Sequence, residues 1–540
     1  MPLILMQGLG NPVSPLPFSV GSGPVAYDFY VASDGGTGTG DKDHPWSIQY
    51  ATGSGGGSAQ GDGKLPTTGA RVAVRGGAAG VQVKYNFSSA LGIDAHGVVG
   101  PDVDSPVGKL IFEGYRSSQF ALPERACLYF TGSNNVDMVQ WSANYTWLKD
   151  LEMARDWPDR DYHGRGATNA WTSTTNGAKL IGCDLHDGDA GMYSEATVGR
   201  GEVYGCWMRN TGFDANSPPG DGGHHLYTHH KGTTDRLGLF ENILGSTFNN
   251  CCQLYHDGDY AEGIDYTGNV HFNAWTLSGP PWPTSGNQLV VGSQTGGRDI
   301  ICTDNLFYWP PGYGDRQIVA PWQAGTPPNT NKLSIIRSYA VGGGLGSGCL
   351  HLQGLFNTQS DGTFQDNFFR PDTGGRCVTV SQAGASLSYN WSGNTWVRVS
   401  TATAWTHAGS NQNWNTFKAN SGLGSTDTQQ DADPTVTRIF VRPTVKYQAG
   451  RGHVIIYNWE NLTNIPVDLS SILSVGDNFA VYDNRDPWHS YFTGTYNGSA
   501  VSFPNTQLTD PTPIGGYGST GQAPPATQPF FNAWIVRKTP

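Results

Sequence analysis

The chain has 540 residues, of which 14% are charged and 12% aromatic, with 74 glycines, 33 prolines and a formal net charge of −12. This composition favours turns and strands and is unlike that of helical or disordered proteins. The negative charge argues against nucleic acid and anionic membranes as partners, and no apolar run is long enough to insert into a membrane. The length exceeds one ordinary core, so we expect more than one domain.

Residues 1–26 are expected to form an N-terminal extension. The first nine residues, MPLILMQGL, are mildly apolar but lack the basic segment and long apolar core of a signal peptide. Chain termini are ordered only where something holds them. We therefore interpret this segment as an anchor to a neighbouring subunit, as in a homotrimer, or to a larger assembly.

A short phrase recurs through the middle of the chain: an apolar strand, a polar pivot and an apolar-x-apolar tail. Its copies include LIGCDLH, VYGCWMR, GLFENIL, DYTGNVHF and ICTDNLFY, with pivots at Asp184, Trp207, Asn242, Asn269 and Asn305. Weaker copies have pivots at Asp150 and Asn367. Spacings of about 20 to 40 residues between similar strands indicate a repeat architecture. Each strand must stack on its neighbours to bury its apolar face, which predicts a parallel β-solenoid with hydrogen-bonded Asn and Asp ladders.

The entry to this region has a more specific pattern. Tyr27–Ile48 reads YDFYVASDGGTGTGDKDHPWSI, Ala70–Gly76 reads ARVAVRG, and KLIFEGY, NGAKLIGCDLHDG and ENILGSTFNNCCQLYHDG follow. These phrases resemble proteins of the right-handed parallel β-helix, pectate-lyase-like superfamily, over roughly residues 27–370. The resemblance implies the fold. It does not fix the chemistry, because this fold is shared by lyases, hydrolases, phage tailspikes and non-catalytic adhesins.

We therefore predict an all-β protein with three parts after the extension. Residues 27–400 form a right-handed parallel β-helix with N-terminal entry strands and loop excursions, and 401–435 form a linker or surface excursion. Residues 436–540 contain short strands separated by Gly and Pro, which predicts an antiparallel β-sandwich-like C-terminal domain. We expect this domain to cap the open end of the solenoid, because a terminal coil exposes an unpaired strand edge.

Two of the eight cysteines, Cys183 and Cys206, occupy the same position in consecutive repeats. They are either stacked buried thiols or a disulfide. The cysteine and histidine spacings do not match a structural zinc site.

The tetrad HDGD occurs twice, at His186–Asp189 and His256–Asp259, each time after a repeat strand. One interpretation is a repeated tight turn, since Asp-Gly is favoured there. The other is that both tetrads lie on one face and line a groove. In that case Asp187, Asp189, Asp257 and Asp259 could bind Ca²⁺, or Asp187, Asp257 and Asp259 could provide the acid and base of a glycosidase.

Histidines are concentrated in HHLYTHHK, which ends at Lys231 and follows Asp221. Strand alternation places His225, Tyr227 and His229 on one face. They are either packed histidines with backbone partners or part of a polysaccharide site, where His225 or His229 transfers a proton beside a carboxylate such as Asp221. A transition metal held by His225 and His229 is a third interpretation.

Further candidates for substrate binding are cations and aromatic rings near these motifs. Arg209 and Lys231 could neutralise an acidic sugar, and Tyr227 lies between the histidines. Trp282 and Trp309 lie in loops rich in Pro and Gly, where they could stack on sugar rings or fill the loops.

Three functions fit these observations. The favoured one is a tailspike-type protein, virion-associated or extracellular, that binds a surface polysaccharide, with or without cleaving it; the resemblance implies a homotrimer for this class. The second is a secreted bacterial polysaccharide lyase or glycoside hydrolase, and the third is a non-catalytic structural or adhesive protein. Ca²⁺ is the candidate cofactor for the HDGD aspartates, beside the transition metal considered for His225 and His229.

Overall fold

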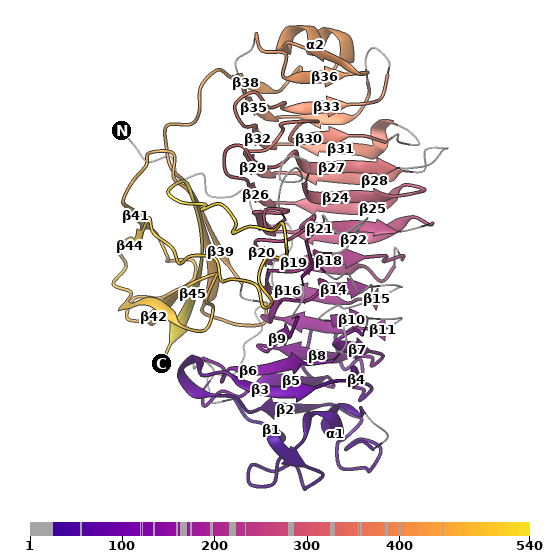
Figure 1. Cartoon of the computed structure of the whole chain (residues 1–540), viewed down its shortest axis with the longest axis vertical. Helices are drawn as coiled ribbons and strands as arrows, with labels where there is room; N and C mark the ends of the chain where they lie inside the picture. The colour runs from indigo at the N-terminus through magenta and orange to yellow at the C-terminus, as the bar shows by residue number, and fades with distance from the viewer. Residues whose placement is uncertain are drawn as a thin grey trace.

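The computed structural model describes residues 25–540 except 55–56, 119, 121, 133–135, 158–159, 162–169, 173–174, 195–197, 215–222, 233, 257, 279–285, 324–329, 355, 357–358, 384–386, 399–400 and 445. Three 12-stranded sheets run along the molecule, and all their strand pairs are parallel except β36 with β37. We call them sheets 1, 2 and 3, in the order in which each coil of the chain visits them. Figure 1 shows the coils stacked along the long axis, so the fold is the predicted right-handed parallel β-helix.

Sheet 1 contains β1 (Phe29–Gly36), β2 (Ala70–Val74), β5 (Leu110–Gly114), β8 (Thr146–Lys149), β12 (Lys179–Ile181), β16 (Glu202–Tyr204), β19 (Leu237–Phe240), β22 (Ala261–Thr267), β25 (Gly297–Thr303), β28 (Asn331–Ile336), β31 (Gly362–Gln365) and β34 (Asn390–Ser392). Sheet 2 contains β3 (Val83–Phe87), β6 (Ala126–Phe130), β9 (Glu152–Arg155), β13 (Asp184–His186), β17 (Trp207–Arg209), β20 (Ile243–Leu244), β23 (Val270–Phe272), β26 (Leu306–Tyr308), β29 (Tyr339–Val341), β32 (Phe368–Arg370), β35 (Thr395–Val397) and β38 (Thr428–Gln430).

Sheet 3 contains β4 (Leu91–Ile93), β7 (Val139–Trp141), β10 (Ala170–Thr172), β14 (Ala190–Ser194), β18 (His224–Thr228), β21 (Cys252–His256), β24 (Asn287–Ser293), β27 (Arg316–Gln323), β30 (Leu350–Leu352), β33 (Val378–Val380), β36 (Trp405–His407) and β37 (Ser410–Gln412). A separate pair is formed by β11 (Thr175–Asn176) and β15 (Val198–Gly199). The helices are α1 (Ile48–Thr52) and α2 (Trp414–Ser421), with 3-10 turns at Ala78–Gly80 and Gln359–Asp361. No helix among the described residues is long and apolar enough to cross a lipid bilayer.

The turn from sheet 1 to sheet 2 carries the predicted amide ladder. In each coil from β8 to β35 the first residue of this turn has a positive φ, and the second residue stacks on the equivalent residue of the next coil. Asn269 Oδ1 accepts hydrogen bonds from the backbone N of Asn242 at 3.1 Å and from its Nδ2 at 2.9 Å. Asn242 Oδ1 accepts in turn from the backbone N of Cys206 at 2.9 Å, and Cys206 Sγ from the N of Cys183 at 3.4 Å. The ladder therefore continues through Cys183 and Cys206, which are free buried thiols, rather than through Asp184 and Trp207.

The interior of the coils is filled by columns of buried side chains, in which a residue of one strand stacks on its aligned residue in the next coil. On sheet 1 the stacked residues are Leu148, Leu180, Val203, Leu239, Tyr266, Cys302, Ile335 and Phe364. A column of this kind removes apolar surface from water only when both neighbouring coils are present, so the coils stabilise one another.

Residues 405–430, which lie within the expected linker, form the last coil instead. β36 pairs with β33 and β38 pairs with β35, so the described sheets extend to Gln430. Helix α2 begins after Asn413, whose side chain accepts from the N of Thr416 at 2.9 Å, and ends at Gly422 with φ 74°. Trp414 packs on Trp405 with ring centroids 5.4 Å apart, so the helix covers the end of the core. The many Asn, Ser and Gly residues in this stretch belong to its caps and turns.

The C-terminal domain contains a five-stranded antiparallel sheet in the order β39 (Arg438–Pro443), β40 (Arg451–Tyr457), β45 (Phe531–Thr539), β42 (Asn478–Asp483) and β43 (Ser490–Thr495). A smaller sheet of β41 (Asn464–Val467) and β44 (Val501–Pro504) packs on one of its faces. The other face packs on the outside of sheet 2, where it shares a core with Trp207, Val270 and Leu306.

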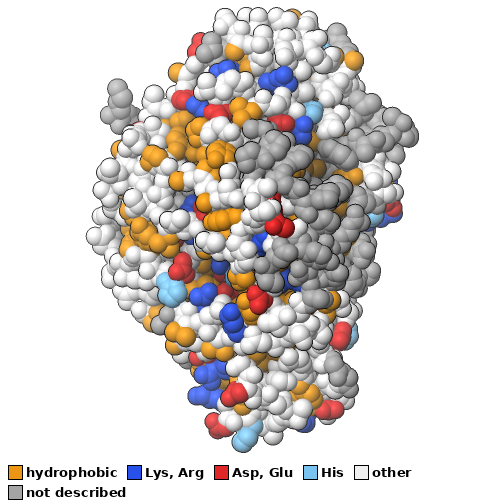
Figure 2. Space-filling view, viewed as in Figure 1, with side chains coloured by type: hydrophobic (Ala, Val, Ile, Leu, Met, Phe, Trp, Pro, Cys, Tyr) orange, Lys and Arg blue, Asp and Glu red, His pale blue; other side chains and the backbone are white. Residues whose placement is uncertain are grey.

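This position differs from the expected cap, because the domain lies along the side of the coils (Figure 1). The reason is that the outer face of sheet 2 is largely apolar from β17 to β29 and needs a cover there. In Figure 2 hydrophobic side chains gather along the seam between the C-terminal domain and the coils, while charged side chains are scattered.

Candidate functional site

The outer face of sheet 3 lies between two rows of connecting loops. Turns from sheet 1 to sheet 2 are short, such as Gly182–Cys183 between β12 and β13. In contrast, β17 ends at Arg209 while β18 begins at His224, and β18 ends at Thr228 while β19 begins at Leu237. Loops of variable length therefore border both edges of sheet 3, and variable loops on a rigid scaffold are where binding residues gather.

This face is partly open on three successive coils. Tyr193, Tyr227 and Gln253 are aligned on β14, β18 and β21 and are half-buried. The next two residues of the column, Val290 and Val319, are buried. Strands of neighbouring coils are about 4.8 Å apart, so this column presents a side chain at regular intervals along the axis.

Four aromatic side chains on and beside this column form what we call the Tyr–His cluster: Tyr193, Tyr227, His229 and His256. The rings of Tyr193 and Tyr227 have centroids 5.2 Å apart, and the Tyr193 hydroxyl lies 3.2 Å from Nδ1 of His229. His229 in turn stacks on His256, with centroids 4.8 Å apart and planes at 19°. A tyrosine hydroxyl at this distance from an imidazole can exchange a proton with it. The cluster thus combines stacking surfaces with a proton-transfer pair.

A charged group, which we call the cationic edge, follows at the turn from sheet 3 to sheet 1. Lys231 Nζ lies 2.5 Å from Asp259 Oδ2 and 4.5 Å from the ring centroid of Tyr260. The guanidinium carbon of Arg298 lies 3.6 Å from the same centroid, and its side chain makes no ion pair with any described residue. The hydrogen bond from Lys231 lowers the pKa of Asp259, which keeps it ionised. Arg298 therefore lies against Tyr260 at the cationic edge, in register with Glu262 on the neighbouring strand.

His225 does not belong to this surface, although strand alternation placed it with Tyr227 and His229. It is 0% exposed, with Nδ1 3.0 Å from Thr211 Oγ1 and Nε2 3.0 Å from the carbonyl oxygen of Gly245. Burial lowers its pKa to about 3. The interpretation of a packed histidine with polar partners therefore applies to His225, and a metal shared by His225 and His229 has no support here.

The two HDGD tetrads lie at different corners of the coil. The first follows β13 of sheet 2, and the second follows β21 of sheet 3. Asp187 of the first has φ 62° and accepts from Nδ1 of His186, from Arg160 and from the backbone N of Ile514. Its carboxylate thus ties the C-terminal segment 505–530 to the coils. A Ca²⁺ site built from both tetrads does not form, since Asp187 and Asp259 are committed to separate ion pairs.

Asp189, the last residue of the first tetrad, has an unusual environment. It precedes β14, and the buried Oδ1 atom has no hydrogen-bond partner among the described residues. Burial raises its pKa to about 7, an effect that Arg155 opposes and Asp137 reinforces. Asp189 and Tyr193 lie four positions apart, which is about 13 Å along a strand. Asp189 therefore lies at the opposite edge of sheet 3 from the cationic edge.

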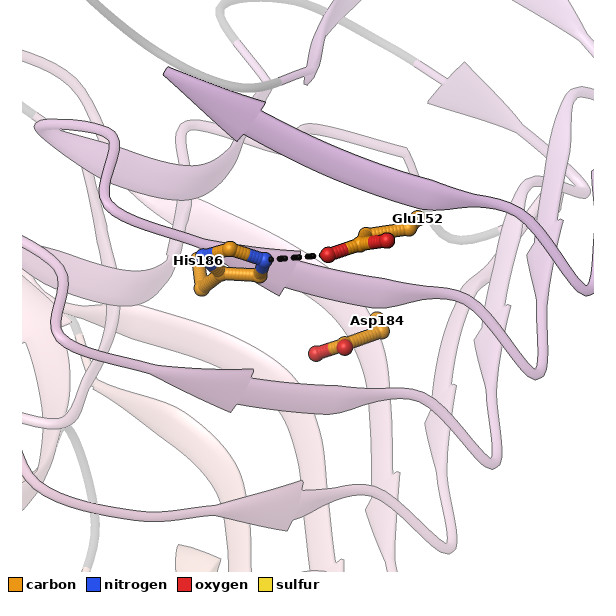
Figure 3. Close-up of side chains that lie close together, drawn as sticks. All are labelled: Glu152, Asp184 and His186. Carbon is orange, nitrogen blue, oxygen red and sulfur yellow. Dashed lines mark hydrogen bonds and ion pairs between the residues drawn. The ribbon is translucent and has the colours of Figure 1, made fainter. Parts of the chain in front are cut away.

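A buried trio on sheet 2, Glu152, Asp184 and His186, has side chains that converge as metal ligands do (Figure 3). Its oxygen atoms already have partners. Glu152 accepts from Arg125 Nε at 2.7 Å and from His186 Nε2 at 3.0 Å. Asp184 pairs with Arg209 and accepts from Trp488 Nε1 at 2.9 Å. Two guanidinium groups compensate the two carboxylates, so the trio fits an ion-pair network that docks the C-terminal domain rather than a metal centre.

Two other predicted binding residues, Arg209 and Trp309, have structural roles. Arg209 belongs to that ion-pair network. Trp309 is 1% exposed and its Nε1 donates to the carbonyl oxygen of Ala274 at 3.0 Å, so it fills the core. Asp221, Asp257 and Trp282 lie outside the described residues.

Four site residues were absent from the sequence-based candidates: Tyr193, His256, Tyr260 and Arg298. Tyr193 occupies the position of Tyr227 one coil earlier, and Tyr260 directly follows the second tetrad. An alignment of sheet 3 strands would have found Tyr193. Arg298 and Tyr260 come together through the pairing of β22 with β25, which no local motif reveals.

A separate cavity of about 310 Å³ lies near the last coils, lined by Arg370, Pro371, Thr373, Val397, Arg398, Asp431, Ala432 and Asp433. Arg370 is held there by Asp433 at 2.8 Å.

No protein-family model matches the chain, and no curated protein sequence matches it. Among solved structures, it is similar to pectate lyase Pel9A, with 12% identity and a TM-score of 0.45 over 67% of this chain and 79% of that one. It is also similar to the Dettilon tailspike protein, with 11% identity and a TM-score of 0.36 over 89% of both chains. A tailspike protein of E. coli bacteriophage HK620 matches with 11% identity and a TM-score of 0.30 over 87% of both chains. These likenesses concern the fold alone.

Proposed function

We propose that this chain binds a polysaccharide across β14, β18 and β21 and cleaves it by elimination. The observation that carries the proposal is the Tyr–His cluster, in which the half-buried rings of Tyr193 and Tyr227 lie on successive coils and the Tyr193 hydroxyl lies 3.2 Å from Nδ1 of His229, which is 8% exposed. Flat aromatic faces suit the apolar faces of sugar rings. Their repetition along the coil axis suits an extended polymer.

In the proposed elimination, Tyr193 and His229 act as the base that removes a proton next to a sugar carboxylate. The electron pair left behind forms a carbon–carbon double bond, and the bond to the leaving sugar breaks. The proton taken by the Tyr193–His229 pair then passes to the leaving oxygen, which returns the pair to its starting state. Arg298 and Lys231 lie at the adjacent edge, where positive charge stabilises the carboxylate as negative charge develops next to it.

A second candidate, glycoside hydrolysis, is favoured by Asp189. A carboxyl group with a pKa near 7 is about half protonated at neutral pH, and the protonated form can donate to a leaving oxygen. Hydrolysis also requires a second carboxylate as base or nucleophile. We take Asp137, whose charge raises the pKa of Asp189, as the candidate for that role.

One assay distinguishes these reactions. The full chain is incubated with neutral and acidic polysaccharides, and new reducing ends and absorbance at the wavelength of unsaturated uronates are followed. Reducing ends with the absorbance support elimination, whereas reducing ends without it support hydrolysis at Asp189. If the chain cleaves no polysaccharide, but binding is lost in Tyr227→Ala and retained in Tyr491→Ala, the result would indicate a binding protein without catalytic activity.

We further propose that the protein acts outside the cell, as a virion-associated tailspike-type homotrimer anchored through residues 1–26. The parallel β-helix and the sequence resemblance support this assignment. The mass of the full chain in solution tests it. Three copies are expected, whereas a monomer favours the secreted lyase or hydrolase.

A further inference from the structure

Two arginines face each other inside the boundary between the C-terminal domain and the coils. Arg451 on β40 pairs directly with Arg537 on β45, and the two residues are 1% and 3% exposed. Both guanidinium groups lie near the ring of Trp207 of sheet 2, at 4.5 and 5.2 Å from its centroid. Like charges directly opposite on neighbouring strands repel each other, and burial strengthens the repulsion.

The protein itself supplies little compensation for this charge. Arg451 donates from Nη2 to the carbonyl oxygen of Gly205. Its Nε, and both Nε and Nη1 of Arg537, are buried without a hydrogen-bond partner among the described residues. Neither arginine forms an ion pair in the described part of the chain. For comparison, Arg116 nearby is paired with Asp150.

Both guanidinium groups remain charged at neutral pH. Burial and the charge of Arg451 together lower the pKa of Arg537 to about 10, against the opposing effect of Asp150. Asp150 is thus one carboxylate shared by three buried arginines, Arg116, Arg451 and Arg537. His453, two residues after Arg451, is also buried, and its pKa lies well below the ordinary value, so it adds no charge.

We propose that a small monovalent anion of the chloride type binds between Arg451 and Arg537 and holds the C-terminal domain against sheet 2. A buried charge without a partner is costly, and unpaired donors of a guanidinium are suited to an anion. The anion would receive hydrogen bonds from both strands β40 and β45 and would screen their mutual repulsion. This site is distinct from the proposed polysaccharide site on sheet 3.

The test measures the unfolding midpoint of the full chain at constant ionic strength while sodium chloride replaces sodium gluconate. The expected result is a saturable rise with chloride, reaching about an elevenfold gain in the folded-to-unfolded ratio at ten times the dissociation constant. Arg537→Met is expected to abolish the response. Arg200→Met, which removes an exposed partner of Asp235, is the matched control and is expected to keep it.

A second measurement does not depend on the folding of any variant. Crystals of the unaltered protein grown in sodium bromide should show an anomalous peak between the Arg451 and Arg537 side chains. The proposal would be overturned by equal stability in chloride and gluconate. It would also be overturned if the crystals showed no bromide at the boundary and an ordered water in contact with both guanidinium groups. A response in sulfate but not in chloride would contradict the assignment to a monovalent anion.

Discussion

The hydroxyl of Tyr193 lies 3.2 Å from Nδ1 of His229, although the two residues are 36 positions apart in the chain. One coil of the β-helix separates them, so the stacking of β14 on β18 creates the contact. His229 is further fixed by stacking on His256 of the following coil. Three consecutive coils thus position the one proton-transfer pair that we assign to the polysaccharide site.

Replacing Tyr193 with phenylalanine removes the hydroxyl and keeps the ring. Because proton transfer by a positioned group contributes about 10²- to 10⁴-fold to a rate, we expect Tyr193→Phe to lower kcat by at least about 100-fold. Affinity for the polysaccharide should change little, since stacking remains. Initial rates and binding are measured in parallel. Tyr491→Phe, which removes a surface hydroxyl 3.2 Å from Thr506, is the control. Equal kcat in the variant and the parent would exclude Tyr193 from the reaction.

The amide ladder makes Asn269 important for stability. Its side chain accepts from Asn242, and its Nδ2 donates to the carbonyl oxygen of Leu239 at 2.9 Å. Asn269→Ala would leave several buried groups unpaired, each at a cost of about 1–3 kcal/mol. We expect the free energy of unfolding to fall by about 2–4 kcal/mol, measured by denaturant titration. Asn390→Ala, at an exposed site, should change it by less than about 0.5 kcal/mol. Similar effects at the two sites would contradict the role of the ladder.

The environment of His186 predicts how stability depends on pH. Burial and the charge of Arg209 lower its pKa, but hydrogen bonds to Asp187 and Glu152 outweigh them and raise it to about 9. The unfolded value is about 6.5, so the protonated form is favoured by folding. This contribution is complete below pH 6.5 and is lost as the pH rises to 9, which corresponds to up to about 3 kcal/mol.

Denaturant titrations at pH 6.5 and 9 measure this loss. His186→Gln is expected to be less stable at pH 6.5 and to show a smaller decline toward pH 9. An unchanged decline in the variant would assign the pH dependence to other groups.

The ion-pair network on sheet 2 is expected to function without a metal. Adding a chelator should leave the unfolding midpoint unchanged, because Arg125 and Arg209 already neutralise Glu152 and Asp184. Arg209→Met, by contrast, leaves Asp184 buried without its ionic partner and should cost about 3–5 kcal/mol. Thermal unfolding with and without the chelator tests both expectations. A large loss of stability on chelation would show that the network binds an ion.

The repeat was predictable from sequence because each coil carries its own local signal. Asn242, Asn269 and Asn305 follow apolar strands at the same turn, and stacking alone explains their recurrence. The position of the C-terminal domain was also encoded. In sheet 2 strands, the outward residues such as Trp207 and Val270 are apolar as well as the inward ones, which indicates a covered face.

The candidate site was predictable only in part. The two identical HDGD tetrads follow strands of different sheets. Assigning a tetrad to a sheet requires knowing where each coil begins, and repeats of unequal length hide this. Alternation placed His225 with Tyr227 and His229, and it could not show that His225 is buried against Gly245 and Thr211. Trp309 likewise reads as a loop residue, and its burial depends on the contact with Ala274.

A structure of the full chain with a bound oligosaccharide tests the central claim most directly, with Tyr193→Phe used to prevent cleavage. The account predicts sugar rings stacked over Tyr227 and His256, and a carboxylate near Arg298. Sugar bound instead in the cavity beside Arg398, or on the outer face of sheet 1, would contradict it.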